Sequence, residues 1–225
     1  MNKFDLKLVK HLDISSETTE NGRFYSVTEG VKYPSVTTVL SSMKDDSWLK
    51  KWEDAVGADY AKTYTAVAAR RGTNLHTLCE EYIKGNPDYL KGHMPFNIAL
   101  FKQVQKILDT SLTEVYGSEI ALYSNHLKVA GRCDLIGKFN GKRSIIDFKT
   151  TNYWKDMDRL SGYFIQEATY MMMFMEMYGL EIEQLVTISA AESEPCAQVV
   201  IIDDPWVWCK RAVKLIKNYY VQNSK

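Results

Sequence analysis

Apolar and polar residues follow two different periods along this chain. A period of two predicts strands, because successive side chains point to opposite faces of a sheet, and spacings of three and four predict helices. Strand-like stretches are 119–124, 127–130, 133–139, 144–148, 185–190 and 197–202, together with 8–14 and 23–28, which flank Asn21-Gly22 in a predicted peripheral hairpin. Helical spacing occurs after Pro34 as far as Met43 and in 47–85, 96–112, 159–178 and 205–222.

Helix boundaries are predicted at two places by residue type. A turn proline, Pro34, is followed by Ser35 and Thr37, either of which can cap the next helix. Hydroxyls at a helix N-terminus can also bind a phosphate, although capping is the simpler interpretation. Within 47–85 the helical spacing is interrupted near position 72, so we expect Gly72 to end one helix and Thr73 to begin the next.

The most informative stretch is 130–150, which reads AGRCDLIGKFNGKRSIIDFKT. Asn140-Gly141 is a strong hairpin-turn dipeptide between two strand-like runs. Side chains alternate across a strand, so Asp147 and Lys149 share one face. Asp134 lies near the start of the partner strand, at a separation that two short strands and a turn take up. We therefore expect Asp134 to lie beside Asp147.

Two adjacent carboxylates repel each other unless a divalent cation lies between them. Such a pair suits metal-assisted cleavage of phosphodiester bonds, and the amine of Lys149 adds a positive charge for the attacking water or the transition state. D-x-K triplets also occur by chance on solvated hairpins. The second acid, Asp134, favours the site interpretation.

Other candidate residues lie outside the hairpin. His76 and Glu80 are one helical turn apart and can either share a metal or form a plain surface pair. Glu119 begins a predicted edge strand, where it either faces the site or is only solvated. Tyr153 and Trp154 follow the Lys149 strand in a loop that can contact a nucleotide by stacking, although such aromatics often only pack.

Composition narrows the class of protein without identifying a partner. The 28 basic and 28 acidic residues cancel, so any phosphate-binding surface has to come from local clustering. The four cysteines have no CxxC spacing, which disfavours a zinc site or a disulfide framework. The chain has no run of 18 apolar residues and no apolar signal core near Met1, so we expect a soluble protein without a membrane partner.

Six motifs occur in an order that resembles the RecB-like exonuclease branch of the PD-(D/E)XK nuclease superfamily. They are YPSVTTVL at 33–40, RGTNLHTLCE at 71–80, EIALYS at 119–124, GRCDLIG at 131–137, IIDFKT at 145–150 and QEATY at 166–170. The resemblance implies an α/β fold with a central mixed β-sheet flanked by helices, a restriction-endonuclease-like core, with an N-terminal helical segment arching over the active site. It implies one domain over 1–225, with a hairpin and helical region at 1–112, the core at 113–204 and a closing helix at 205–225.

The resemblance also implies roles for individual residues. Mg²⁺ or Mn²⁺ would be bound by His76, Asp134, Asp147 and the carbonyl of Phe148, with Lys149 positioning the water. Glu80 and Glu119 are further possible site residues. DNA contacts would come from Gln166 and Tyr170, which match the branch's QxxxY motif, and from Ser35, Thr37, Arg71, Tyr153 and Trp154. Some relatives bind an iron–sulfur cluster through four cysteines, and without a cysteine trio after the QxxxY helix we expect none here.

These features favour a metal-dependent exonuclease acting on single-stranded DNA ends in repair or recombination. The expected protein is a monomer in a bacterial or phage-infected cytoplasm or an organellar matrix. A structure-specific DNA endonuclease and a non-catalytic DNA-end-binding accessory protein remain alternatives. A structural protein with an accidental D-x-K triplet would bind neither metal nor DNA.

Overall fold

The structure is a computed structural model that describes residues 3–43 and 47–223. Its main sheet has six strands in the order β1-β5-β6-β7-β8-β9. The β1–β5 and β7–β8 pairs are parallel and the other neighbours are antiparallel, so the sheet is mixed. The strands are β1 (Asp5–Leu6), β5 (Leu112–Ser124), β6 (Val129–Phe139), β7 (Lys142–Thr151), β8 (Gln184–Ala191) and β9 (Gln198–Ile202).

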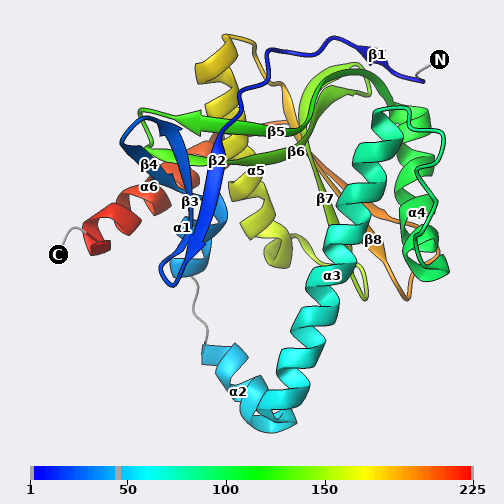
Figure 1. Ribbon diagram of the computed structural model, residues 1–225, viewed down its shortest axis with the longest axis horizontal. Coiled ribbons are helices and arrows are strands. Elements are labelled where there is room, and N and C mark those ends of the chain that lie inside the picture. Colours follow the sequence, from blue (N-terminus) through cyan, green and yellow to red (C-terminus); the bar gives the residue numbers. More distant parts are fainter. Residues whose placement is uncertain (1–2, 44–46, 224–225) are drawn as a thin grey trace.

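Helices cover both faces of this sheet, which confirms the predicted α/β class (Figure 1). On one face α3 and α4 pack against β5, β7 and β8, and on the other α5 packs against β5 to β8 with α6 behind it. The helices are α1 (Val36–Ser42), α2 (Ser47–Val56), α3 (Ala58–Ile83), α4 (Pro95–Ser111), α5 (Met157–Tyr178) and α6 (Trp206–Asn223). Within the described residues, none of these helices combines the length and apolarity needed to span a bilayer.

The N-terminal hairpin forms a separate three-stranded sheet of β2 (Ser15–Thr19), β3 (Gly22–Thr28) and β4 (Val31–Pro34). The predicted hairpin is present, with its turn at Glu20-Asn21 and Gly22 as the first residue of β3, but the predicted first strand at 8–14 is wrong, since the strand paired with β3 begins at Ser15. Every residue of β2 is exposed, so no apolar pattern marks this strand in the sequence. The turn sets its register instead.

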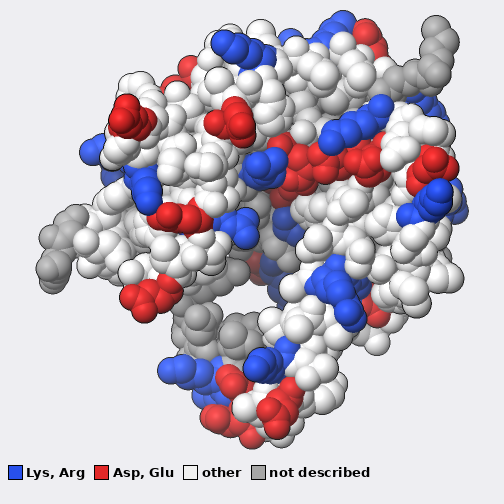
Figure 2. All heavy atoms as spheres, in the orientation of Figure 1, with Lys and Arg blue, Asp and Glu red and all other residues white. Residues whose placement is uncertain are grey.

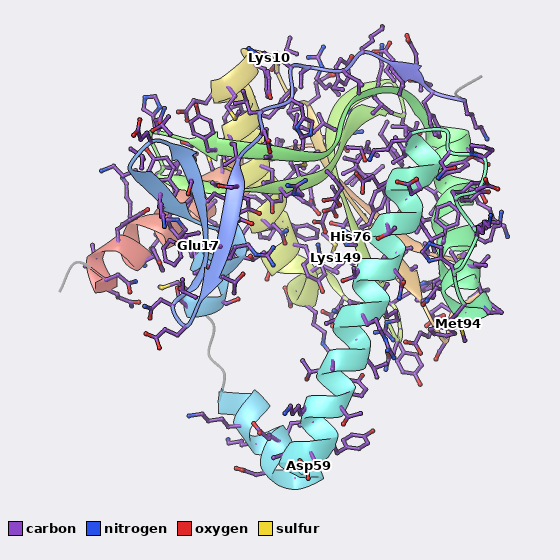
Figure 3. The ribbon with its side chains drawn as sticks, viewed as in Figure 1. Lys10, Glu17, Asp59, His76, Met94 and Lys149 are labelled. Carbon is purple, nitrogen blue, oxygen red and sulfur yellow. The ribbon has the colours of Figure 1, made fainter. Side chains whose placement is uncertain are left out.

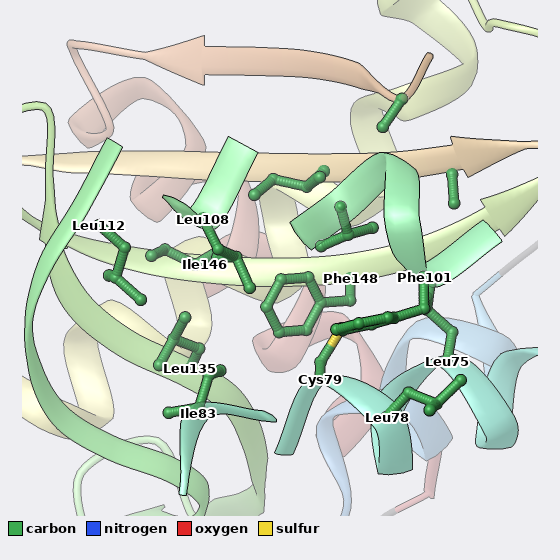
Figure 4. Packing of buried hydrophobic residues seen from close by; sticks show 14 of the residues in the cluster. Leu75, Leu78, Cys79, Ile83, Phe101, Leu108, Leu112, Leu135, Ile146 and Phe148 are labelled. Carbon is green, nitrogen blue, oxygen red and sulfur yellow. The ribbon is translucent and has the colours of Figure 1, made fainter. Parts of the chain in front are cut away.

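The face of the sheet under α3 and α4 carries an aromatic-rich core. Phe148 and Ile146 of β7 point into it, as the alternation of side chains predicted, and meet Leu75 and Cys79 of α3 and Phe101 of α4 (Figure 4). All five side chains are almost fully buried. This packing fixes α3 against the strand that carries Asp147 and Lys149.

Helix α3 runs without interruption through Gly72, so the predicted break at Gly72 and restart at Thr73 are wrong. A glycine inside a helix costs only about 1 kcal/mol, and the packing of Leu75, Leu78, Cys79 and Ile83 against the core outweighs it. The break lies at Gly57 instead. Its φ of 87° is a left-handed conformation that favours glycine and separates α2 from α3.

Candidate active site

The hairpin of β6 and β7 brings the two predicted aspartates together. Its turn residues, Asn140 and Gly141, have φ values of 49° and 83°, which suits a two-residue turn with the twist of the flanking strands. The ladder pairs Leu135 with Ile146, so Asp134 and Asp147 occupy the next position along it. Regular pairing stops there.

The side chain of Asp134 replaces the missing ladder contact. The backbone N–H of Phe148 donates a hydrogen bond of 2.8 Å to Oδ2 of Asp134. This bond holds the carboxylate across the end of the hairpin and leaves its Oδ1 directed at His76 of α3, 3.3 Å away. Asp134 is 8% exposed, so its charge is compensated by protein groups more than by water.

His76 approaches from α3 and joins a second acid. Its Nδ1 lies 3.6 Å from Oε1 of Glu119, and the edge of its ring faces Phe148 at a centroid distance of 6.5 Å. One ligand atom each from His76, Glu119 and Asp134 lies within 4.8 Å of the others. Burial would lower the pKa of His76, but the charge of Asp134 and hydrogen bonds to Asp134 and Glu119 raise it to about 10. Burial would likewise raise the pKa of Asp134, and His76 overrides this to lower it.

The predicted position of Glu119 at the start of an edge strand is wrong. It lies inside β5, which is flanked by β1 and β6, and its φ of 49° is left-handed. The register of β5 with β6 places Glu119 opposite Asp134, and its carboxylate meets His76. Glu119 thereby joins the cluster around His76.

The buried Asp147 forms an ion pair with Lys149, whose side chain lies beside His76 (Figure 3). Asp147 is 1% exposed, and within the described residues neither of its oxygens accepts a hydrogen bond of normal geometry. Burial, aided by the charge of Asp134, raises the pKa of Asp147 to about 6 despite the nearby ammonium. Burial would lower the pKa of Lys149, but the two aspartates raise it, so Lys149 is protonated.

The donor set fits a divalent cation. An imidazole nitrogen and carboxylate oxygens are ligands that such ions accept, and a buried carboxylate without hydrogen bonds gains most from a cation. His76, Asp134 and Glu119 make up the compact group, whereas the Asp147 side chain is paired with Lys149. The backbone N–H of Phe148 donates a hydrogen bond to Asp134. Metal binding through the backbone carbonyl of Phe148 stays a prediction.

The predicted DNA-contacting residues lie in three places. Gln166 donates to the Tyr170 hydroxyl at 3.3 Å on α5, and the oxygens of Ser35 and Thr37 are 2.9 Å apart at the start of α1, where Ser35 is the cap. Arg71 pairs with Glu192 and with Asn152, and Tyr153 and Trp154 are 64% and 47% exposed. Glu80 forms an ion pair of 2.7 Å with Lys84 and is not part of the cluster around His76.

Sequence reasoning missed Glu167, the residue after Gln166. Its side chain is fully buried and hydrogen-bonds the Thr187 hydroxyl on β8, and burial, with the charge of Asp147, raises its pKa well above the usual value. An acid next to a polar glutamine looks like part of a solvated helix face. Phe164 lies three residues before Glu167 and Met171 four residues after it, so the three side chains share one face of the helix. This spacing was the one signal in the sequence that Glu167 faces the sheet.

The raised pKa of Asp147 predicts a pH effect on the metal-free protein. An acid whose folded pKa lies above its unfolded value contributes stability that is lost as pH rises, here between 3.8 and about 6. Asp147→Asn cannot ionise. Relative to the native chain, its free energy of unfolding should therefore improve by about 2 kcal/mol between pH 4 and pH 7. Urea unfolding in EDTA measures both free energies of unfolding. A variant that becomes less stable relative to the native chain as the pH rises would contradict the prediction.

The chain is similar in sequence to a nuclease family and to a curated exonuclease. The profile of the PD-(D/E)XK nuclease superfamily matches residues 46–195. The chain is 26% identical over 133 residues to mitochondrial genome maintenance exonuclease 1 of Mus musculus, a match that covers 56% of this chain and 39% of the mouse protein. The chain thus matches well under half the length of this curated relative.

A crystal structure of a proposed exonuclease from Eubacterium rectale resembles the fold with a TM-score of 0.46 at 15% sequence identity. That superposition covers 66% of this chain and 64% of the bacterial one. The family profile spans well over half of the chain and includes α3, the β6–β7 hairpin and α5. The chain therefore belongs to the PD-(D/E)XK nuclease superfamily.

Proposed function

We propose that the chain hydrolyses DNA phosphodiester bonds with the help of Mg²⁺ or Mn²⁺. The observation that carries this proposal is the meeting of His76, Asp134 and Glu119 beside the Asp147–Lys149 pair, in a member of a nuclease superfamily. His76, Asp134 and Asp147 are the proposed metal ligands, and the position of Glu119 adds it to that set.

Each side chain has a chemical role that follows from its environment. A bound divalent cation would polarise the scissile phosphate and lower the pKa of a water molecule. Lys149 is held protonated by two aspartates, so it presents a fixed positive charge to the oxygen that develops charge in the transition state. The raised pKa of His76 means that its ring gives up a proton when it binds a metal.

A preference for single strands is supported by the arm that α2 and the first half of α3 form. The arm extends away from the sheet in Figure 1, and Figure 2 shows the surface hollowed between the arm and the rest of the molecule, with basic side chains near the rim. On the arm, Tyr60 and Tyr64 stack with ring centroids 6.3 Å apart and are 58% and 44% exposed. Exposed aromatic faces can stack with unpaired bases, which a duplex does not offer.

Digestion of labelled DNA with and without divalent metal tests the proposal. We expect metal-dependent shortening of linear single strands, little cleavage of blunt duplex, and none of circular single strands. Strands labelled at the 5′ or the 3′ end give the polarity. Cleavage of circles would instead identify an endonuclease, and a mobility shift without shortening would identify a DNA-binding accessory protein.

A further inference from the structure

A cavity of about 510 Å³ lies between α1 and the beginning of α5, next to the candidate active site. Its size is within the range of sites that hold a small molecule or one nucleotide. The polar side chains around it come from both helices and from the loop before α5, and they are Thr37, Ser41, Lys155, Arg159, Ser161, Tyr163 and Gln166.

The charge around this cavity is of one sign. Lys155 and Arg159 contribute two cations, and none of the described residues in its lining is an aspartate or glutamate. The Lys155 ammonium contacts the hydroxyl and the ring of Tyr163, and within the described part of the chain it forms no ion pair with a carboxylate. Arg159 is 76% exposed, and its Nε lies 3.8 Å from Asp156, at the long limit of an ion pair. An anion entering the cavity would therefore meet two cations that are weakly compensated.

Tyr163 connects this cavity to the chemistry. The ammonium nitrogens of Lys149 and Lys155 lie 5.1 and 5.2 Å from the centroid of the same Tyr163 ring. The cation proposed to act on the scissile phosphate and the first cation of the cavity are thus separated by a single aromatic side chain. A nucleic-acid strand carries a phosphate on every nucleotide, so a strand held at Lys149 brings a neighbouring phosphate towards Lys155.

We propose that Lys155 and Arg159 bind a phosphate of the substrate strand adjacent to the scissile one, and that the cavity beside them receives the attached nucleoside. This subsite rests on the proposed function and deepens it. The hydroxyls of Thr37 and Ser41 and the Gln166 amide offer hydrogen bonds to that nucleoside without a charge that would repel the phosphate. The bound phosphate is either internal or the terminal phosphate of a strand end.

The test compares Lys155→Ala/Arg159→Ala with a control that loses the same charge, Lys91→Ala/Lys106→Ala. Both control lysines are exposed and lie outside this cavity. Binding of a fluorescent oligothymidine is measured by anisotropy in EDTA over a range of salt concentrations. We expect the Kd of the subsite variant to rise about tenfold at low salt, and its salt slope to fall by about 0.7 for each phosphate that the protein no longer neutralises. The control pair should bind as the native chain does.

Kinetics and modified substrates complete the test. The KM of the subsite variant should rise by about the same factor as its Kd, with kcat within about threefold of native. Replacing the phosphate next to the cleaved bond by a neutral methylphosphonate should raise the KM of the native chain for that strand. It should leave the KM of the subsite variant unchanged. Strands with a 5′-phosphate or a 5′-hydroxyl then show which phosphate is bound. If the subsite variant binds both kinds of strand more weakly than the native chain does, the bound phosphate is internal. If it binds only the 5′-phosphorylated strand more weakly, the bound phosphate is the terminal one.

Two outcomes would overturn the inference, and they differ from each other. A subsite variant that binds and cleaves like the control pair, while the native chain is active, removes the subsite and leaves the nuclease assignment in place. A native chain that neither binds nor cleaves DNA removes both.

Discussion

Asp134→Asn is expected to reduce the rate of metal-dependent DNA cleavage by about a thousandfold or more. Asp134 is both a proposed metal ligand and the group that raises the pKa of His76, so losing its charge weakens two members of the cluster at once. A loss of several kcal/mol in transition-state stabilisation corresponds to that factor. The amide oxygen of asparagine can still accept the hydrogen bond from the Phe148 N–H, so the hairpin should fold.

The measurement is an initial rate on labelled single-stranded DNA, with circular dichroism to verify folding. Asp203→Asn is the matched control, because Asp203 is an exposed carboxylate whose partner is Lys142, 2.7 Å away at the surface. The control should cleave at the native rate. Native-like cleavage by a folded Asp134→Asn protein would rule out the metal site described above.

Lys149→Met is expected to reduce cleavage about 100- to 1000-fold while metal binding persists. The residue supplies charge to the transition state and is not a metal ligand, so its loss lowers kcat and leaves the cluster around His76 in place. The variant also leaves Asp147 buried without its ion-pair partner. We therefore expect it to be less stable than the native chain at pH 8, and closer to it at pH 5, where Asp147 is protonated.

Two readouts separate these effects. The rise in melting temperature on adding Mn²⁺ reports metal binding, and single-turnover cleavage reports the chemical step. Lys142→Met removes the equivalent lysine from the surface pair with Asp203 and should change neither readout. If Lys149→Met abolished the Mn²⁺ effect but preserved cleavage, the roles assigned to Lys149 and the acids would be wrong.

The parts of the site that were predictable from sequence are those fixed by local rules. The Asn140-Gly141 turn and the alternation of side chains place Asp134 at the ladder position of Asp147 and put Ile146 and Phe148 in the core. Ser35 caps α1 because its side-chain oxygen is within reach of the free backbone N–H of Thr38 in the first turn. Each of these features depends only on residues close to it in the sequence, so a short stretch of sequence is enough to predict it.

The parts that escaped prediction depend on distant contacts. Gly72 reads as a helix breaker, but packing of α3 on the sheet overrides its propensity, and the break falls at Gly57. Glu119 lies opposite Asp134 in the β5–β6 register and meets His76 from α3, so its place in the cluster depends on two elements far from it in sequence. Glu167 of α5 is buried against the sheet, where it accepts a hydrogen bond from Thr187 of β8. No short-range rule is enough to place any of these three.

The parallel pairing of β7 with β8 affects when the candidate site can form during synthesis of the chain. Asp147 and Lys149 lie opposite Thr187 and Ser189 of β8, which the ribosome produces only after the whole of α5. A nascent chain that ends before β8 has the charged side chains of β7 without the neighbour that holds that strand in the sheet. A ribosome-bound chain that still lacks β8 is therefore expected to lack the ordered Asp147–Lys149 pair.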